Sequence, residues 1–272
     1  MVTPAARREV VGFFRQNYQL NRTQACRLAG LSRQALYYEP TKGRDEALRA
    51  RLKALGEQYP RYGYLLLHAI LKREGLVVNK KRTYRLYRQL RMQVRTKRRK
   101  KLIRPRVPLA LPSQPGERWS IDFVHDQLAD GRRFRILNIV DDYSRRCIGQ
   151  IIDTSISGER LVRYFDELSQ TEQLPKTIVL DNGPEMTSKA MFLWASSKRI
   201  KLHFIQPGKP TQNAFVESFN GRFRDGCLNQ HYFRNLDEAK EIINTWRNHY
   251  NHERAHSSLN YQTPILYEEQ AA

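Results

Sequence analysis

The chain has 272 residues and carries 48 Lys and Arg against 27 Asp and Glu, a formal net charge of +21. Such an excess of positive charge is typical of a protein that contacts nucleic-acid phosphates, with a ribosomal or general RNA-binding protein as the plainer alternative. The sequence contains no run of about 18 apolar residues, the length a membrane-spanning helix needs, and no apolar segment near its start that would indicate a signal peptide.

The charge is divided unevenly along the chain. Residues 1–115 hold 28 Lys and Arg against 6 Asp and Glu, a net charge of +22, whereas residues 116–272 have a net charge of −1. We therefore expect phosphate contacts mainly in the first part. The three cysteines are far apart and odd in number, which indicates neither a disulfide framework nor a zinc site and suits a reducing cytoplasm.

Residues 1–42 are predicted to form a helix-turn-helix. A first helix over Pro4–Tyr18 carries apolar residues on one stripe, and Thr23 is the expected N-cap of a short second helix. Gly30 then breaks the pattern, and Ser32 can cap a further helix.

That further helix opens with Arg33 and Gln34. Placed in a major groove, these two side chains would reach base edges. A plain helical hairpin that packs against the rest of the chain is the alternative.

Residues 43–93 are predicted to form a second helical DNA-binding module. A turn at 59–63 precedes one helix, and a basic helix follows Asn79. Lys80, Lys81 and Arg82 on that helix are candidate phosphate contacts, although a solvated basic face over an ordinary core would show the same pattern. Its aromatic residues, Tyr84 and Tyr87, are expected to lie in the core.

Residues 94–115 are predicted to be a basic, extended linker, since a dense run of Lys and Arg is followed by several prolines. Such a segment would follow a DNA backbone without reading its sequence. The candidate DNA contacts here are Arg98, Arg99, Lys100 and Lys101, and Lys209 in a later loop is another.

Residues 116–270 have a mixed α/β pattern. Three short strands near 119–124, 134–140 and 147–152 are joined by tight turns, which predicts an antiparallel meander. A helix, a strand at 177–180, a helix, a strand near 202–205 and two more helices follow. This order, β-β-β-α-β-α-β-α-α, is that of a ribonuclease-H-like core, so we expect an α/β fold preceded by small all-α modules.

Three acidic residues in this core are candidate metal ligands. Asp122 lies within the first strand, Asp181 ends the fourth, and Glu217 lies on a helix. Carboxylates together with phosphate oxygens are the ligands that Mg²⁺ prefers, and two such ions can assist displacement at a phosphodiester.

Other acidic residues compete for this role. Glu185 follows Asp181 closely, and we expect it to tie the loop after Asp181 rather than to bind metal. Asp141 and Asp142 are expected to shape a turn with Ser144, because short acidic side chains bond to nearby backbone amides.

The residues around the three carboxylates resemble a known family. Trp119–Phe123, Leu180–Glu185 and Gln212–Gly221 are similar, in order and spacing, to motifs of the DDE transposases of the bacterial IS-three insertion-sequence family. The resemblance is closest to the product of the second reading frame (OrfB), which is related to retroviral integrases. Arg61–Tyr64 and the segment 256–264 match other parts of that family.

The resemblance implies a polynucleotidyl transferase that cleaves and joins DNA strands. It implies that Asp122, Asp181 and Glu217 are catalytic and bind two Mg²⁺, with Mn²⁺ able to substitute, and that Arg224 contacts DNA. Double-stranded DNA, both element ends and target, is the expected partner, with a homo-oligomer assembled on it in the cytoplasm, at the nucleoid. Retroviral integrases carry a zinc module, but only Cys26 and His68 of the required types occur in the first hundred residues, so no zinc is expected.

The family's active enzyme is usually a frameshift fusion whose first-frame part supplies another helix-turn-helix and a leucine zipper. This sequence shows no long leucine heptad, so we expect it to lack those parts, and a first-frame product or a fusion with it is a candidate partner. Two alternatives stay open: a DNA-binding regulator without chemistry, and a nuclease of the ribonuclease-H type.

Overall fold

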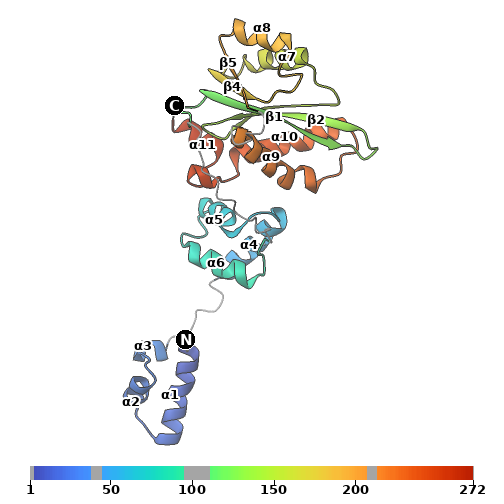
Figure 1. The fold of residues 1–272 in the computed structure, drawn as a ribbon. Coiled ribbons are helices and arrows are strands. Elements are labelled where there is room, and N and C mark those ends of the chain that lie inside the picture. The colour runs from blue at the N-terminus through green and yellow to red at the C-terminus, as the bar shows by residue number, and fades with distance from the viewer. Residues whose placement is uncertain (1–2, 38–44, 95–110, 207–212, 272) are drawn as a thin grey trace. The chain divides into compact units, whose positions relative to one another are not determined.

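The computed structural model describes residues 3–37, 45–94, 111–206 and 213–271. The chain forms two compact units, Met1–Ala50 and Arg51–Ala272 (Figure 1). In the described part of the chain, no helix is long and apolar enough to cross a membrane. The predicted linker lies almost wholly outside the described residues.

The first unit contains the three helices α1 (Pro4–Tyr18), α2 (Arg22–Leu28) and α3 (Arg33–Leu36). Its small core contains Val11, Ala25, Cys26 and Leu31. The first helix matches its prediction, but its stripe is only partly buried, because Phe13 is 53% exposed.

The caps of α2 and α3 decide where these helices begin. Ser32 caps α3 as expected, accepting a hydrogen bond from the Ala35 N–H at 3.2 Å. The prediction of Thr23 as the cap of α2 is wrong, since Asn21 takes that place and forms a capping box with Gln24. Two donors are satisfied in this arrangement rather than one, which explains the earlier start.

The second helical module contains α4 (Glu46–Gln58), α5 (Tyr64–Arg73) and α6 (Lys80–Gln89). Asn79 caps α6 through a 2.9 Å hydrogen bond from the Lys81 N–H. Tyr87 is buried as expected, but Tyr84 is 44% exposed, so its assignment to the core is wrong. Its ring lies instead against Tyr64 at the module's surface, with centroids 4.8 Å apart.

The remainder of the second unit is built on a five-stranded sheet with the order β3-β2-β1-β4-β5. The first three strands form the predicted antiparallel meander, and β4 and β5 add in parallel. The strands are β1 (Arg118–Gln127), β2 (Arg133–Asp141), β3 (Cys147–Asp153), β4 (Thr177–Leu180) and β5 (Lys201–Phe204).

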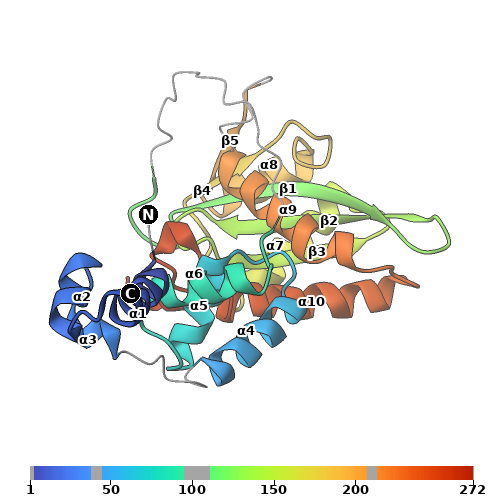
Figure 2. The same ribbon diagram turned by 90° about the horizontal axis from the view of Figure 1, so that it is seen from below.

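Helices cover both faces of the sheet (Figures 1 and 2). On one face lie α7 (Gly158–Leu168) and α8 (Lys189–Ser197), and their apolar residues share a core with Trp119 and Ile121 of β1. On the other lie α9 (Ala214–Gly226) and α10 (Leu236–His252), which pack around Val124.

The chain ends in elements that the sequence pattern did not predict as helical. A short 3₁₀ turn spans Ser257–Leu259, and α11 (Pro264–Glu269) follows, capped by Thr263. Another 3₁₀ turn, Leu228–Gln230, separates α9 from α10. With these additions, the order and layering are those of the predicted ribonuclease-H-like fold.

Candidate active site

Parallel pairing of β1 with β4 brings two of the predicted carboxylates to the same level of the sheet. Trp119 pairs with Ile178 and Ser120 with Val179. The same register, continued for two residues, places Asp181 level with Asp122. Strand alternation turns Asp122 away from the face that buries Trp119 and Ile121 and toward α9.

A chain of buried amides holds the Asp122 carboxylate in place. The Asn220 side chain on α9 donates a 2.7 Å hydrogen bond to Asp122 Oδ2 and accepts one of 2.7 Å from Asn138. Asn138 in turn accepts a 2.7 Å bond from Gln150. Since Asp122, Asn138 and Gln150 face one another across β1, β2 and β3, the chain crosses three strands at one level.

Burial raises the pKa of Asp122 to about 6. The negative charges of Asp181 and Glu217 act in the same direction, while hydrogen bonds from the Phe123 N–H and from Asn220 oppose it. The effect of both acidic neighbours on one carboxyl group shows that β1, β4 and α9 bring the three predicted carboxylates into electrostatic reach of one another.

Glu217 reaches this region from the first turns of α9. Buried Asn213, directly before the helix, donates a 3.2 Å hydrogen bond to the Ile121 carbonyl of β1 and so ties the helix start to the central strand. The Glu217 side chain is exposed, yet partial desolvation still raises its pKa. It is therefore the least constrained of the three carboxylates.

The three carboxylates do not form a closed cage. Among the residues that the structure describes, no group of three or more His, Cys, Asp and Glu side chains is close enough to hold a metal ion. The donor set nevertheless fits a hard divalent cation, because it consists of carboxylate oxygens. A cation would also offset the mutual repulsion that helps to raise the Asp122 pKa.

The loop after Asp181 is tight and leaves little room for larger side chains. The Gly183 N–H donates a 3.0 Å hydrogen bond to Asp181 Oδ1. A Cβ added at Gly183 would lie 3.1 Å from that oxygen and 3.3 Å from Glu185 Oε2. Glu185 itself forms an ion pair with Arg135 on β2. Burial favours a higher pKa for Glu185, but the bond from Arg135 holds it below its usual value.

Asp141 shapes a turn, as predicted. Its Oδ1 accepts hydrogen bonds from the backbone N–H groups of Tyr143 and Ser144, at 2.9 and 2.7 Å. Its Oδ2 accepts a 2.9 Å bond from the Gly116 N–H. The same prediction is wrong for Asp142, because its buried carboxylate forms an ion pair with Arg118 and, among the described residues, does not bond to the amides of the turn. Both carboxylates therefore stabilise the fold.

The sequence reasoning did not identify several residues around the carboxylates. Asn138 and Gln150 interrupt otherwise apolar strands, which was the available signal. Arg135 lies with its guanidinium 4.1 Å from the centroid of the Phe123 ring. Burial lowers the pKa of His125 on β1, and the positive charges of Arg135 and Arg224 lower it further. These cations therefore surround the end of β1.

The predicted DNA contacts fall into three groups. Arg33, Gln34, Lys80, Lys81 and Arg224 are exposed on their helices. Arg82 is half-buried and has interactions of its own. The remaining candidates lie outside the described residues: Arg98, Arg99, Lys100, Lys101 and Lys209.

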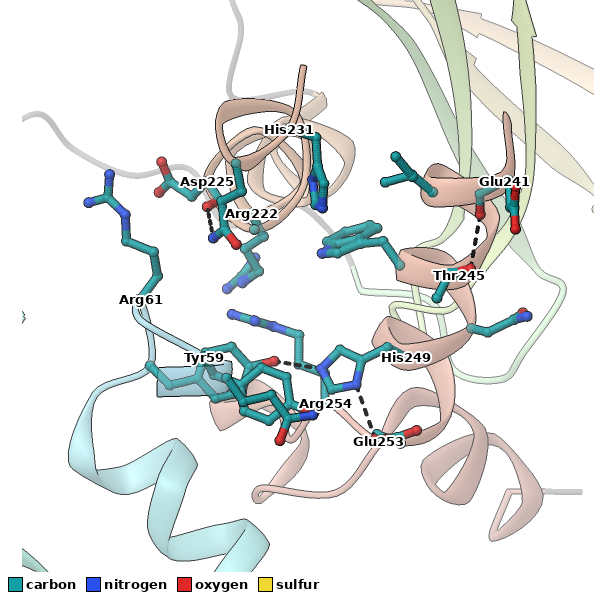
Figure 3. Close-up of a pocket in the computed structure, with 17 residues that line it drawn as sticks. Tyr59, Arg61, Arg222, Asp225, His231, Glu241, Thr245, His249, Glu253 and Arg254 are labelled. Atoms are coloured by element: carbon teal, nitrogen blue, oxygen red, sulfur yellow. Dashed lines mark hydrogen bonds and ion pairs between the residues drawn. The ribbon is translucent and has the colours of Figure 1, made fainter. Parts of the chain in front are cut away.

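A cavity of about 750 Å³ lies where the second helical module meets α9 and α10 (Figure 3). The Tyr59 ring stacks on His249 with centroids 4.9 Å apart, and Tyr62 Oη is 3.0 Å from His249 Nε2. Arg254 lies 4.7 Å from the centroid of the Tyr62 ring. Aromatic stacking thus fixes the module against the helix layer that carries Glu217.

Family models match most of the chain. Residues 112–210 and 198–264 match two models that are both described as an integrase core domain. Residues 43–100, which include the second helical module, match an HTH-like domain. The matched integrase segments contain all three candidate carboxylates.

The chain is also similar to whole proteins of insertion elements. It is 45% identical over 252 residues to an uncharacterised 31.7 kDa protein of insertion element IS407 from Burkholderia multivorans, covering 92% of this chain and 91% of that protein. It is 42% identical over 268 residues to an uncharacterised 39.2 kDa protein of insertion element IS476 from Xanthomonas euvesicatoria, covering 98% of this chain and 78% of that one.

Solved structures support the fold. A chain of the simian T-cell lymphotropic virus intasome in complex with PP2A regulatory subunit B56 gamma superimposes with a TM-score of 0.51 at 17% identity, covering 80% of this chain and 74% of that one. Together with the integrase-core matches and the identity to insertion-element proteins, this establishes that the chain belongs to the integrase-core transposases of bacterial insertion sequences, of the IS-three second-reading-frame type.

Proposed function

We propose that this transposase cleaves DNA at the ends of its element and joins the freed 3′ ends to target DNA, using Asp122, Asp181 and Glu217 as its catalytic residues. The observation that supports this most strongly is the raised pKa of Asp122, which is caused first by burial and then by the negative charges of Asp181 and Glu217. Strongly shifted carboxyl groups within an integrase core are candidates for chemistry rather than for structure alone.

The three carboxylates would hold two divalent ions, Mg²⁺ or in its place Mn²⁺. When bound, such ions lower the pKa of an attacking water or 3′-hydroxyl and stabilise the leaving oxygen of the phosphodiester. The protein's part is to fix the ligands: Asn220 orients Asp122, and the Gly183 N–H orients Asp181. No covalent protein intermediate is required.

The helical parts would bind the DNA. We propose functional divisions at 1–42, 43–93, 94–115 and 116–270, in which the first two segments bind element ends and the third follows the backbone. The exposed Lys80 and Lys81 on α6, together with Arg33 and Gln34 on α3, suit phosphate and base-edge contact. Arg224 would hold a phosphate close to the carboxylates. The enzyme would work on cytoplasmic DNA as a homo-oligomer.

A regulator without chemistry is not favoured, because the chain belongs to a transposase family and retains all three carboxylates. The first-frame product remains a proposed partner, either as a fusion or in trans. Its part would be to supply further end recognition and dimerisation.

Strand transfer by the purified chain tests this proposal. Labelled duplexes with the element's own ends are incubated with Mg²⁺, and joined product is measured. Glu217→Gln should lower joining by about two to three orders of magnitude, the loss typical when one group that stabilises developing charge is removed. DNA binding, measured by fluorescence anisotropy, should persist in that variant.

Glu185→Gln is the matched control, because the same chemical change occurs in a carboxylate that pairs with Arg135. It should still join DNA, at a rate well above that of Glu217→Gln. Its unfolding temperature is measured as well, because the change breaks a largely buried ion pair. If the wild type joins only when fused to the first-frame product, the chain is the catalytic part of a larger enzyme. Joining by Glu217→Gln at the wild-type rate would overturn the assignment.

A further inference from the structure

Two sequence motifs that the carboxylates do not explain meet at a second cavity. The turn that contains Arg61–Tyr64 and the segment that begins at His256 both line it, together with Arg222 of α9. The cavity has a volume of about 340 Å³. The residues that line it and matter here are Gly63, Tyr64, Arg222, Arg254, His256 and Ser257.

The charge lining this cavity is positive. Arg222 on α9 and Arg254 after α10 both line it, and no acidic residue does. Their side chains extend toward each other in Figure 3. Within the part of the chain that the structure describes, the Arg222 guanidinium bonds to the backbone carbonyl and hydroxyl of Ser218, one turn earlier. Neither guanidinium forms an ion pair within the described residues, and the buried Arg254 Nε has no hydrogen-bond partner there.

The start of α5 adds donors to the same cavity. Gly63 is the N-cap residue and has no side chain with which to cap the helix. The Gly63 carbonyl accepts from the N–H groups of Leu66 and Leu67 in this ten-residue helix. Within the described residues, the N–H groups left to an outside acceptor are therefore those of Tyr64 and Leu65. Helix N-termini of this kind bind anions, because their N–H groups and the helix dipole both favour negative charge.

His256 supplies an independent sign that a ligand is missing. It is only 4% exposed, and its Nε2 has no hydrogen-bond partner among the described residues. Buried polar atoms are normally bonded, so an atom of this kind calls for a partner from outside. Burial lowers the pKa of His256 to about 3, and the charges of Arg254 and Arg222 lower it further. The ring is therefore neutral, and its Nε2 would bond to a phosphate oxygen through a bridging water.

We propose that this cavity binds a backbone phosphate of DNA, and that it is a DNA-binding site separate from the carboxylates. This proposal rests on the proposed function only in naming DNA as the source of the phosphate. A phosphodiester would neutralise two arginines that otherwise face each other, and the N–H groups of α5 and the Ser257 hydroxyl could bond to its oxygens. The larger cavity is less suitable, since Asp225, Glu241 and Glu253 line it as well.

The site would connect end recognition to catalysis. Arg222 lies on the same helix as Glu217, and Gly63 belongs to the helical module. A phosphate bound between them would fix one DNA strand to the module and to the catalytic helix at once. Arg222 is thus a positioning residue, whereas Glu217 would act on the reacting phosphodiester.

Ethylation interference tests the proposal. Duplexes are ethylated at single phosphates, bound to protein in EDTA, and separated into bound and free fractions. With wild-type protein, ethylation at one position should weaken binding. With Arg222→Gln, ethylation at that position should no longer matter, and the slope of log Kobs against log salt should become about 0.9 less steep, the value for one phosphate contact.

Arg163→Gln is the matched control, because Arg163 is exposed on α7, on the other face of the sheet. It should keep the wild-type interference pattern. Arg254→Gln provides a second variant, with its unfolding temperature measured because Arg254 also packs on Tyr62. Interference patterns identical to wild type in both cavity variants would overturn the proposal.

Two kinds of duplex identify the source of the phosphate. One duplex carries the element's end, and the other is unrelated target DNA. In one of them, there should be a phosphate whose ethylation weakens binding of the wild type but not of Arg222→Gln. Failure of the site and failure of the proposed catalysis can be told apart. If the cavity variants keep the wild-type interference pattern while the wild type joins DNA normally, only the phosphate site is disproved. If Glu217→Gln joins DNA while Arg222→Gln alters the interference pattern, only the catalytic assignment is disproved.

Discussion

Asp122 and Glu217 belong to the same site but are held in opposite ways. Asp122 lies on the central strand, with neighbours on both sides and a 2.7 Å hydrogen bond from Asn220. Glu217 is exposed on the first turns of α9. That helix is tied to β1 by Asn213 and Asn220, but the Glu217 side chain itself extends into solvent. The comparison suggests that the strand carboxylates define the site and that the helix carboxylate completes it when a cation binds.

The largest expected effect is on cation affinity. Asp122→Asn should weaken Mn²⁺ binding more than about 100-fold, beyond the 10- to 100-fold loss typical of removing an outer partner of a ligand. Glu217→Gln should weaken it less and lower the number of ions bound from two to one. Electron paramagnetic resonance of free Mn²⁺ measures both quantities without DNA. Equal losses of Mn²⁺ affinity in Asp122→Asn and Glu217→Gln would contradict the view that Asp122 defines the site and Glu217 only completes it.

Removing the outer support of Asp122 should have an intermediate effect. Asn220→Ala deletes the hydrogen bond to Asp122 and leaves the buried Asn138 amide without its acceptor. We expect Mn²⁺ affinity to fall by about 10- to 100-fold and stability by about 1–3 kcal/mol. Asn244→Ala, at an exposed position on α10, is the control and should change neither. Unchanged affinity in Asn220→Ala would mean that the amide chain has no role in binding.

The raised pKa of Asp122 predicts a pH-dependent difference in stability. In the folded protein its pKa is about 6, against 3.8 for an unperturbed Asp, so the wild type loses stability as pH rises through this window. Asp122→Asn has no charge to bury and should unfold at a higher temperature than the wild type at pH 7 in EDTA. The difference should shrink below pH 6 and disappear near pH 4. A constant difference over this range would show that Asp122 is not the titrating group.

The smallest expected effect concerns Arg224, which is exposed on α9 seven residues after Glu217. Arg224→Gln should weaken DNA binding about equally for different sequences and reduce the salt slope by about 1, as expected for one phosphate contact. Cation affinity without DNA should stay unchanged. Loss of Mn²⁺ binding in this variant would place Arg224 among the groups that hold the site together.

Local patterns were enough to predict most elements of the core. The apolar run that ends at Asp181 predicts β4, because such a run is a property of a short segment. The cap of α2 was predicted wrongly, because the structure places Asn21 there with Gln24 as its capping-box partner. Tyr84 was misjudged because helical periodicity does not show which side of a small module is covered.

The polar chain behind Asp122 could not be predicted in the same way. Asn138 and Gln150 are visible as polar residues in apolar strands, but only the register across β1, β2 and β3 shows that they face Asp122. The contact between the Arg61–Tyr64 turn and the segment at His256 could not be predicted either, for the same reason. Nearly two hundred residues separate these segments in the sequence, and tertiary packing alone brings them to one cavity.

The central claim is that β1, β4 and α9 bring three carboxylates to one divalent-cation site. Anomalous diffraction from crystals soaked in Mn²⁺ tests it most directly. The account predicts anomalous density within coordinating distance of the Asp122 and Asp181 carboxylates, with Glu217 turned toward it. Density elsewhere in the molecule, or none beside Asp122 at saturating Mn²⁺, would contradict the account.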